Sequence, residues 1–215
     1  MSYLPKAFEV QDAAQMQRLV TAHPLATWVQ TDADGALQVH HLPLWLDPQR
    51  GPRGTFFGHV ARANPLWRSA GRPGVAVFHG PQAYVSPSWY PAKQVHGKVV
   101  PTWNYAVVHA HGALRLVTEP AAVRDILRRL TDSQEADQAR PWRLADAPAD
   151  YLEGQLGAIV GIEIEIDRWV GKFKLSQNRS EADRQGVVAG LLASRAPGAR
   201  GVAEEMVCWP QEAGT

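Results

Sequence analysis

Residues 84–112 combine aromatic rings, hydroxyl groups, an amide and a lysine with several prolines. Residues 84–90 and 101–105 carry most of the rings, and Lys93 lies between them. Rings can cover the face of a flat, partly polar ligand, while hydroxyl and amide groups orient its edges. These residues therefore predict a pocket wall. A proline-punctuated surface loop, whose tryptophans pack back onto the fold, is an equally good interpretation of the composition alone.

A second candidate, an anion site, follows from Arg62 and Asn64. They lie just after Gly58 and His59, where a strand is expected to give way to a short helix. A guanidinium and the free amides at a helix start can together bind a phosphate. The alternative is a capped helix beside a solvated arginine.

Two histidines, His109 and His111, are spaced to share one face of a strand. They could hold a metal ion together with His40 or His41. No carboxylate or cysteine lies nearby at ligand spacing, and histidines on a half-buried strand usually form local hydrogen bonds. We therefore expect no metal site.

Two polar segments complete the candidates. Residues 174–179, Lys-Leu-Ser-Gln-Asn-Arg, could close over a ligand or a partner subunit, or could only connect a strand to a helix. Arg124, Arg128 and Arg129 give one predicted helix a basic side. A solvated face explains them better than a DNA-reading helix, because no helix-turn-helix pair precedes them.

Composition limits the class of protein. The 215 residues predict one domain, residues 1–215, with a helical C-terminal segment at about residues 180–209. The 22 Lys+Arg and 21 Asp+Glu give a net charge of +1, which argues against a broad nucleic-acid surface, although a local patch would still allow DNA binding. A single cysteine, Cys208, excludes an internal disulfide. No secretion signal or membrane-length apolar run is evident, so we expect a cytoplasmic protein without a membrane partner.

The elements that must position these residues are mostly strands. Ile162, Ile164 and Ile166 alternate with acidic residues, which is typical of a strand with one buried face. Residues 171–175 are expected to return from that strand, and residues 37–46 to form one strand containing Pro43. Residues 32–35 predict a hairpin turn, and Val123 and Ile126 lie on the apolar side of a predicted helix. The fold class predicted is mostly β with flanking helices (α+β), an antiparallel barrel.

Several motifs together resemble those of the PaiB family, FMN-binding-type proteins described as negative transcriptional regulators. They follow the order expected for that family over almost the whole chain: Tyr3-x-Pro5-x-x-Phe8, His41-Leu42-Pro43-Leu44, Gly58-His59-Val60-Ala61-Arg62-Ala63-Asn64-Pro65, Tyr84-x-Ser86-Pro87-Ser88-Trp89-Tyr90, Pro101-Thr102-Trp103-Asn104-Tyr105 and Lys174-Leu175-Ser176-Gln177-Asn178-Arg179. The family is similar to the split β-barrel flavoproteins that include the pyridoxamine-phosphate oxidases. The resemblance implies a homodimer with FMN in a cleft at the subunit interface.

The resemblance also implies roles for individual residues. One group would lie along the flavin: His41, Leu42, Pro43 and Leu44. A second would approach its phosphate: His59, Ala61, Arg62 and Asn64. A third would supply walls or edge contacts, in part from the second subunit: Trp103, Asn104, Tyr105, Ser176 and Gln177. Lys93, from the aromatic segment, is included in the predicted cofactor-binding set.

The resemblance departs from the oxidases at His40 and His41, where the oxidases carry an arginine and a lysine. Histidine is charged only part of the time near neutral pH, so phosphate binding would be weaker or would depend more on Arg62. Three functions fit these residues. They are an FMN-binding regulator, a flavin-dependent oxidoreductase, and a barrel that has lost its cofactor and serves as an interaction or DNA-binding module. Flavin chemistry requires no particular acid or base from the protein, so catalytic residues are not predicted.

Overall fold

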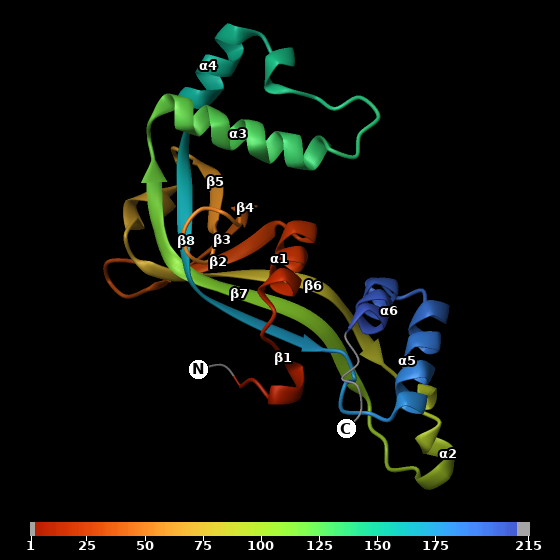
Figure 1. The fold of residues 1–215 in the computed structure, drawn as a ribbon. Helices are drawn as coiled ribbons and strands as arrows, with labels where there is room; N and C mark the ends of the chain where they lie inside the picture. Colours follow the sequence, from red (N-terminus) through yellow and green to blue (C-terminus); the bar gives the residue numbers. More distant parts are fainter. Residues whose placement is uncertain (1–2, 210–215) are drawn as a thin grey trace. The chain divides into compact units, whose positions relative to one another are not determined.

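A computed structural model describes residues 3–209 (Figure 1), so the ends of the predicted 1–215 domain, residues 1, 2 and 210–215, lie outside the described part. The chain folds mainly as antiparallel β-structure with helices. The strands are β1 (Glu9–Val10), β2 (Leu25–Thr31), β3 (Leu37–Pro43), β4 (Trp45–Asp47), β5 (Thr55–Ala61), β6 (Pro73–Val85), β7 (Thr102–Val117) and β8 (Ile159–Lys174). The α-helices are α1 (Ala13–Ala22), α2 (Ala92–His96), α3 (Pro120–Glu135), α4 (Ala149–Gly157), α5 (Glu181–Ala193) and α6 (Ala199–Cys208).

These strands form one hydrogen-bonded order, β3-β2-β6-β7-β8-β5-β4, with β1 paired to β8. The chain divides into two compact units. Unit 1 comprises residues up to 12, 79–108 and from 170 on, and unit 2 comprises residues 13–78 and 109–169. Strands β6, β7 and β8 each contribute residues to both units. Each unit is described below by itself, and the single domain stays a prediction.

In unit 2, the β2–β3 hairpin forms where turn chemistry predicts it. The Asp32 carboxylate accepts hydrogen bonds from the backbone N–H groups of Asp34 and Ala36, and Gly35 takes the left-handed conformation that the turn requires (φ 82°). Ala26 and Trp28 on β2 are completely buried. The hairpin thus buries one face of each strand and leaves the other face open.

The predicted strand over residues 37–46 is two strands, β3 and β4, interrupted at Leu44. The Leu44 N–H donates to Pro24 O instead of to a neighbouring strand. A Cβ at Gly58 of β5 would lie 2.8 Å from Leu44 Cδ2 and 3.0 Å from Pro43 O, so the interrupted segment packs closely against β5. Only glycine allows this approach.

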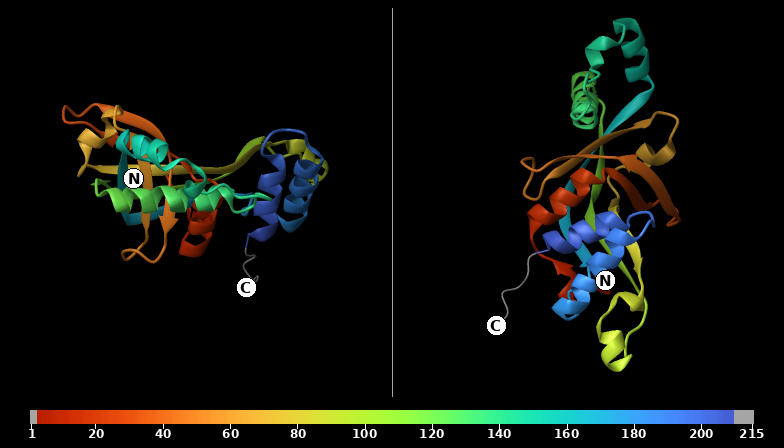
Figure 2. Two further views of the ribbon diagram at one scale, coloured as in Figure 1. Left: turned by 90° about the horizontal axis from the view of Figure 1, so that it is seen from above. Right: turned by 90° about the vertical axis from the view of Figure 1, so that its right-hand side faces the viewer.

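Helix α3 begins at Pro120, where a proline costs no hydrogen bond. Val123 and Ile126 are buried as predicted, and α3 continues to Glu135. Both views in Figure 2 place α4 beside α3, and Arg124 and Glu153 form an ion pair between them. Strand β8 carries the predicted isoleucine alternation but runs unbroken to Lys174, so the prediction of a separate return strand at residues 171–175 is wrong.

In unit 1, helices α5 and α6 pack side by side (Figure 2). Ser180 caps α5 by accepting a hydrogen bond from the Asp183 N–H, as its sequence predicts. Gly190 of α5 lies directly against the Trp89 indole, because a Cβ there would be 2.3 Å from Trp89 Cδ2. Helix α6 ends at the exposed Cys208. Across residues 3–209, no helix combines the length and the apolarity needed to cross a membrane.

Candidate functional site

The predicted cofactor-binding residues fall into two groups, one in each unit. Unit 2 holds the residues of β3 and β5 and those next to them: His41, Leu42, Pro43, Leu44, His59, Ala61, Arg62 and Asn64. Unit 1 holds Lys93, Trp103, Asn104, Tyr105, Ser176 and Gln177. The structure brings residues together within each group.

On β3, the predicted flavin contacts alternate between surface and core. His41 and Pro43 are exposed, whereas Leu42 and Leu44 are buried. The His41 ring is held by a contact between its Nδ1 and the Thr27 hydroxyl, at 3.3 Å. Of these four residues, only His41 and Pro43 can therefore contact a ligand on this face through their side chains, while the two leucines support them from within.

His59 on β5 is half-buried, and one of its ring nitrogens is buried without a hydrogen-bond partner among the described residues. Its Nδ1 is inaccessible to solvent and has no partner among the described residues. Burial lowers the pKa of His59 below its ordinary value, so the ring is neutral near pH 7. A buried polar atom with no partner is uncommon in folded proteins and often marks a functional site.

Arg62 is fixed against the start of β8. Its Nε donates to Gly157 O and one terminal nitrogen to Ile159 O, both at 3.0 Å, and its backbone N–H donates to Ala158 O. The side chain thus satisfies a carbonyl at the C-terminal end of α4, which favours a cation. Among the described residues no carboxylate pairs with Arg62, so its charge remains uncompensated.

Asn64 caps a short helix, which is the role that the alternative interpretation of the sequence gave it. Its side-chain oxygen accepts a hydrogen bond from the Leu66 N–H and caps the 3₁₀-helix η2 (Pro65–Ser69). The helix predicted from Ala61 is therefore shorter, since Ala61 still belongs to β5. Trp67 adds a further tie by donating from its indole to Arg62 O at 2.9 Å.

These residues fit an anionic group at the end of β5. Arg62 supplies an exposed guanidinium without a carboxylate partner among the described residues, and His59 lies three residues before it on β5. A phosphate needs such donors. When bound, FMN would supply the redox chemistry, and the chain's own residues would bind and orient it.

In unit 1, the polar residues of the motifs form a buried network. Asn104 on β7 is fully buried, and its Nδ2 donates to Ser176 Oγ at 2.9 Å. Gln177 accepts from the Leu175 N–H at 2.7 Å and donates to Phe173 O, so it closes the end of β8. Asn104 and Ser176 are bonded to each other and Gln177 to the backbone of its own segment, which makes all three supports for a surface in this arrangement.

Trp103, Tyr105 and Lys93 of unit 1 each have contacts of their own, and Trp103 is 48% exposed. Its ring packs edge-on against Tyr84, with centroids 6.3 Å apart, and its indole donates to Gln82 Oε1 at 3.2 Å. Tyr105 lies under the ammonium of Lys172, 5.7 Å from the ring centroid, and Lys93 donates to Ser88 Oγ.

Sequence reasoning missed Lys174, whose ammonium binds Thr102 Oγ1 and Trp103 O. Burial, more than the charges of Lys172 and Arg179, lowers the pKa of Lys174. Its place in the 174–179 motif was the available signal.

The histidine pair considered for a metal lies on β7 within unit 2. The rings of His109 and His111 are 6.5 Å apart, and His111 Nε2 is 3.1 Å from an Arg168 nitrogen. Burial and the nearby Arg168 lower the pKa of His111. Within residues 3–209, no group of three or more His, Cys, Asp or Glu side chains is arranged to hold a metal ion.

The sheet order and its helices define a flavoprotein-type split barrel. The fold is similar to that of an FAD and heme binding protein from Mycobacterium smegmatis (TM-score 0.61, 19% identity, 85% of this chain and 80% of that chain). It is also similar to the flavocytochrome Anf3 from Azotobacter vinelandii (TM-score 0.57, 15% identity, 77% and 69%). The predicted fold class, mostly β with flanking helices in a split barrel, is confirmed.

The chain belongs to the family described as "Putative FMN-binding domain", whose model matches residues 2–168. It is 32% identical over 206 residues to the "Protease synthase and sporulation protein PAI 2" of Bacillus subtilis (strain 168), covering 95% of this chain and 96% of that protein. The resemblance to the PaiB family and the prediction of FMN as the cofactor are thereby confirmed. The individual contact residues stay predictions.

Proposed function

We propose that the protein binds FMN as a homodimer and acts as a transcriptional regulator that responds to its flavin. In this proposal, His41 and Pro43 contact the flavin on the open face of β3. Arg62 and His59 approach its phosphate. The second subunit contributes Trp103 and Tyr105 as ring walls, supported by its Asn104, Ser176 and Gln177.

The observation that carries the proposal is the uncovered apolar face of the β2–β3 hairpin. Leu25, Leu37 and Val39 are 60%, 72% and 57% exposed, and their strand pairing places them on the same face as His41 and Pro43. Apolar side chains gathered in this way usually mark an interaction surface. A second copy of the chain, with a flat ring between the copies, would cover them.

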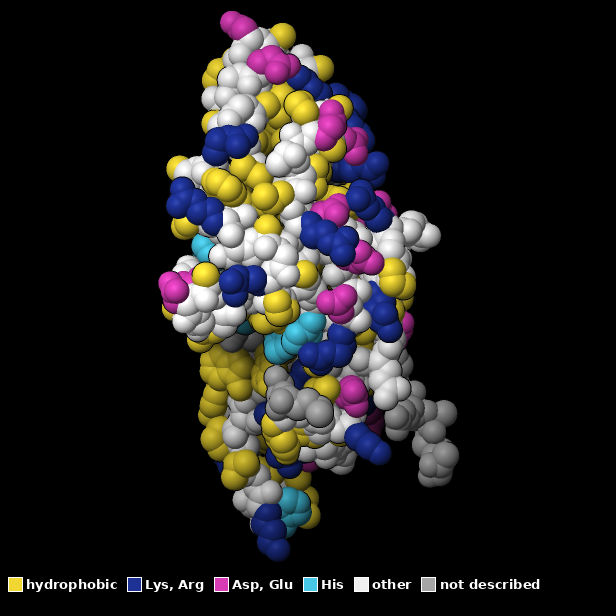
Figure 3. Space-filling model, turned by 90° about the vertical axis from the view of Figure 1, so that its left-hand side faces the viewer, with side chains coloured by type: hydrophobic (Ala, Val, Ile, Leu, Met, Phe, Trp, Pro, Cys, Tyr) yellow, Lys and Arg dark blue, Asp and Glu magenta, His cyan; other side chains and the backbone are white. Residues whose placement is uncertain are grey.

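Regulation through the flavin state is a better fit than direct reading of DNA. The net charge is +1, and on the face shown in Figure 3 the basic side chains are interspersed with acidic ones. A DNA-binding surface normally concentrates Lys and Arg. The name of the Bacillus subtilis relative, which refers to protease synthesis and sporulation, also supports a role in controlling expression.

A flavin-dependent oxidoreductase is the alternative function. His41 and Pro43 are exposed, so a small electron donor or acceptor could reach a flavin bound beside them. NAD(P)H-dependent bleaching of the flavin with turnover of an acceptor would favour this alternative. A flavin-dependent, salt-sensitive gel shift with promoter DNA would favour direct regulation instead.

The test of binding uses purified protein, FMN and one pair of matched variants. Val39→Lys places a charge on the open β2–β3 face, and Val95→Lys places the same charge on the exposed side of α2. We expect the wild-type protein and Val95→Lys to sediment as dimers and to retain the yellow flavin band after gel filtration. Val39→Lys should sediment as a monomer and lose FMN. A wild-type monomer, or FMN retained equally by both variants, would overturn the proposal.

A further inference from the structure

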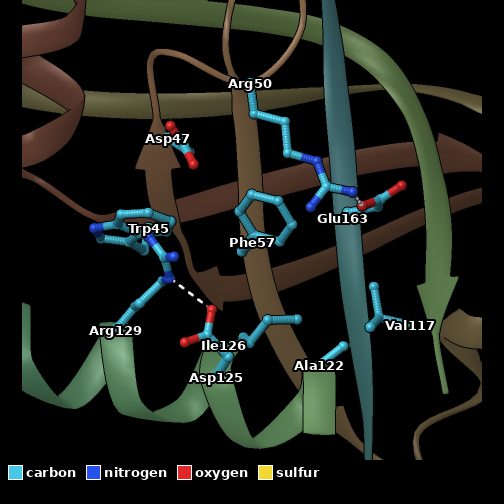
Figure 4. A pocket seen from close by; sticks show the side chains of 10 residues that line it. All are labelled: Trp45, Asp47, Arg50, Phe57, Val117, Ala122, Asp125, Ile126, Arg129 and Glu163. Atoms are coloured by element: carbon cyan, nitrogen blue, oxygen red, sulfur yellow. Dashed lines mark hydrogen bonds and ion pairs between the residues drawn. The ribbon is translucent and has the colours of Figure 1, made fainter. Parts of the chain in front are cut away.

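A small cavity lies in unit 2 between strands β4, β5 and helix α3 (Figure 4). Its volume is about 150 Å³, similar to that of apolar protein cavities that accommodate a benzene molecule. Trp45 and Phe57, which are partners across β4 and β5, form one wall with ring centroids 5.9 Å apart. Ala122 and Ile126 of α3 contribute an apolar surface opposite them.

The charged lining of this cavity has an excess of carboxylates. The lining holds three carboxylates, on Asp47, Asp125 and Glu163, and two guanidiniums, on Arg50 and Arg129, so its formal charge is −1. Both guanidiniums are neutralised by a partner in the lining. Arg50 pairs with Glu163 and Arg129 pairs with Asp125, each at 2.7 Å. A third guanidinium, that of Arg128, lies outside the lining and pairs with Asp125 at 2.7 Å.

Asp47 is the carboxylate left over. Its Oδ1 accepts a hydrogen bond from the Gln49 N–H at 3.0 Å, and it has no ion-pair partner among residues 3–209. Glu163 also retains capacity, because only its Oε2 is bonded to Arg50 and its side chain is only 16% exposed. Two half-satisfied carboxylates therefore border one cavity.

The rings of this wall already contact positive charge. The Arg50 guanidinium lies 4.8 Å from the Phe57 ring centroid, and that of Arg129 lies 5.0 Å from the Trp45 ring. Both are within the range of a cation–π interaction. Each ring is therefore already in contact with a guanidinium of the lining, so the carboxylates supply the attraction for a further cation.

We propose that this cavity binds a small organic cation, an alkylammonium or guanidinium group. Its charged end lies at Asp47 and Glu163, and its apolar part packs against Trp45 and Phe57. The site is separate from the flavin contacts proposed above and does not depend on bound FMN.

The test follows the Trp45 indole N–H by NMR, assigned through its loss in Trp45→Phe. The probes are n-butylammonium, n-butanol and butyrate at equal concentration and matched ionic strength. We expect a saturable shift with n-butylammonium alone. An equal shift with n-butanol would show a merely apolar cavity, and stronger binding of butyrate would show an anion site at the arginines. Either result, or no saturable shift, would overturn the proposal.

Two conservative substitutions locate the cation. Asp47→Asn keeps an acceptor for the Gln49 N–H and removes the charge, so we expect at least fivefold weaker n-butylammonium binding. Glu163→Gln should have a similar effect. Glu165→Gln is its matched control, because Glu165 lies two residues along β8, pairs with Arg115 and does not line the cavity. Equal losses in Glu163→Gln and Glu165→Gln would contradict the proposal even if Asp47→Asn failed to fold.

Discussion

Asn104 and Ser176, 72 residues apart in the chain, are joined by a buried side-chain hydrogen bond. Ser176 holds a φ of 63°, a left-handed conformation that costs a non-glycine residue about 1–2 kcal/mol. The Asn104 amide also contacts Met206 Sδ of α6 at 3.6 Å. The bond to Asn104 thus helps to hold Ser176 in a strained conformation at the end of β8.

Asn104→Ala should therefore destabilise the protein. It removes the partner of a buried hydroxyl, and an unsatisfied buried group costs about 1–3 kcal/mol. Asn178→Ala, in an exposed residue of the same segment, should change stability by less than about 0.5 kcal/mol. Urea unfolding of both variants checks this, and equal midpoints would mean that the network contributes no stability.

Gly190→Ala should be destabilising by about 1–3 kcal/mol, because the new methyl group would overlap the Trp89 ring. Gly154→Ala is the matched control. Gly154 is also helical, in α4, but no atom lies within 4 Å of the position that a methyl group would take there, so alanine should stabilise by roughly 0.5–1 kcal/mol. Opposite shifts in the thermal midpoint are expected. Trp89→Leu should reduce the penalty at Gly190 in a double-mutant cycle.

Arg62 is expected to act both as a structural tie and as a phosphate contact, and two variants separate the roles. Arg62→Ala should lower stability, since two hydrogen bonds to carbonyls are lost, and should weaken FMN binding by roughly 1.5–3 kcal/mol. Arg62→Lys loses the planar guanidinium that donates to two carbonyl groups but keeps the positive charge. It should be destabilised to a similar extent and yet bind FMN more tightly than Arg62→Ala. Equal FMN affinities would remove Arg62 from the phosphate site.

The free energy of unfolding should decrease as the pH is lowered, because of His59. Burial places the pKa of His59 in the folded protein below its ordinary value of 6.5, so protonation favours the unfolded chain. The stability that neutral His59 contributes is complete above pH 6.5. It is lost as the pH falls through the lower pKa that His59 has in the folded protein. In His59→Gln, the free energy of unfolding should depend less on pH between about pH 7 and pH 5. His79→Gln, at an exposed histidine of β6, should keep the wild-type slope.

Local patterns predicted much of the fold. The alternation of Ile162, Ile164 and Ile166 and the turn at Asp32 each depend on neighbouring residues, so their elements were placed correctly. The course of β8 was not predicted correctly. Asp167, Arg168 and Trp169 interrupt the alternation, yet the strand continues because Gly171 pairs with Val10 of β1, far away in the sequence.

The candidate site shows the same limit. The motifs predicted which residues contact the cofactor, but they did not indicate which of these side chains are buried. Alternation alone predicts that His41 and Pro43 share a face, whereas the tie from Arg62 to Gly157 and Ile159 joins segments 95 and 97 residues apart. The cavity beside Trp45 and Phe57 was not predicted either, because it requires α3 to pack across β4 and β5.

The single thiol at the end of α6 can be labelled selectively. Cys208 is exposed and is the only cysteine of the 215 residues, so a maleimide reagent should attach a single fluorophore or spin label per chain without mutagenesis. In a dimer, two such labels would report the spacing between subunits directly. The spacing between the two labels could therefore be used to follow dimer association while flavin is added.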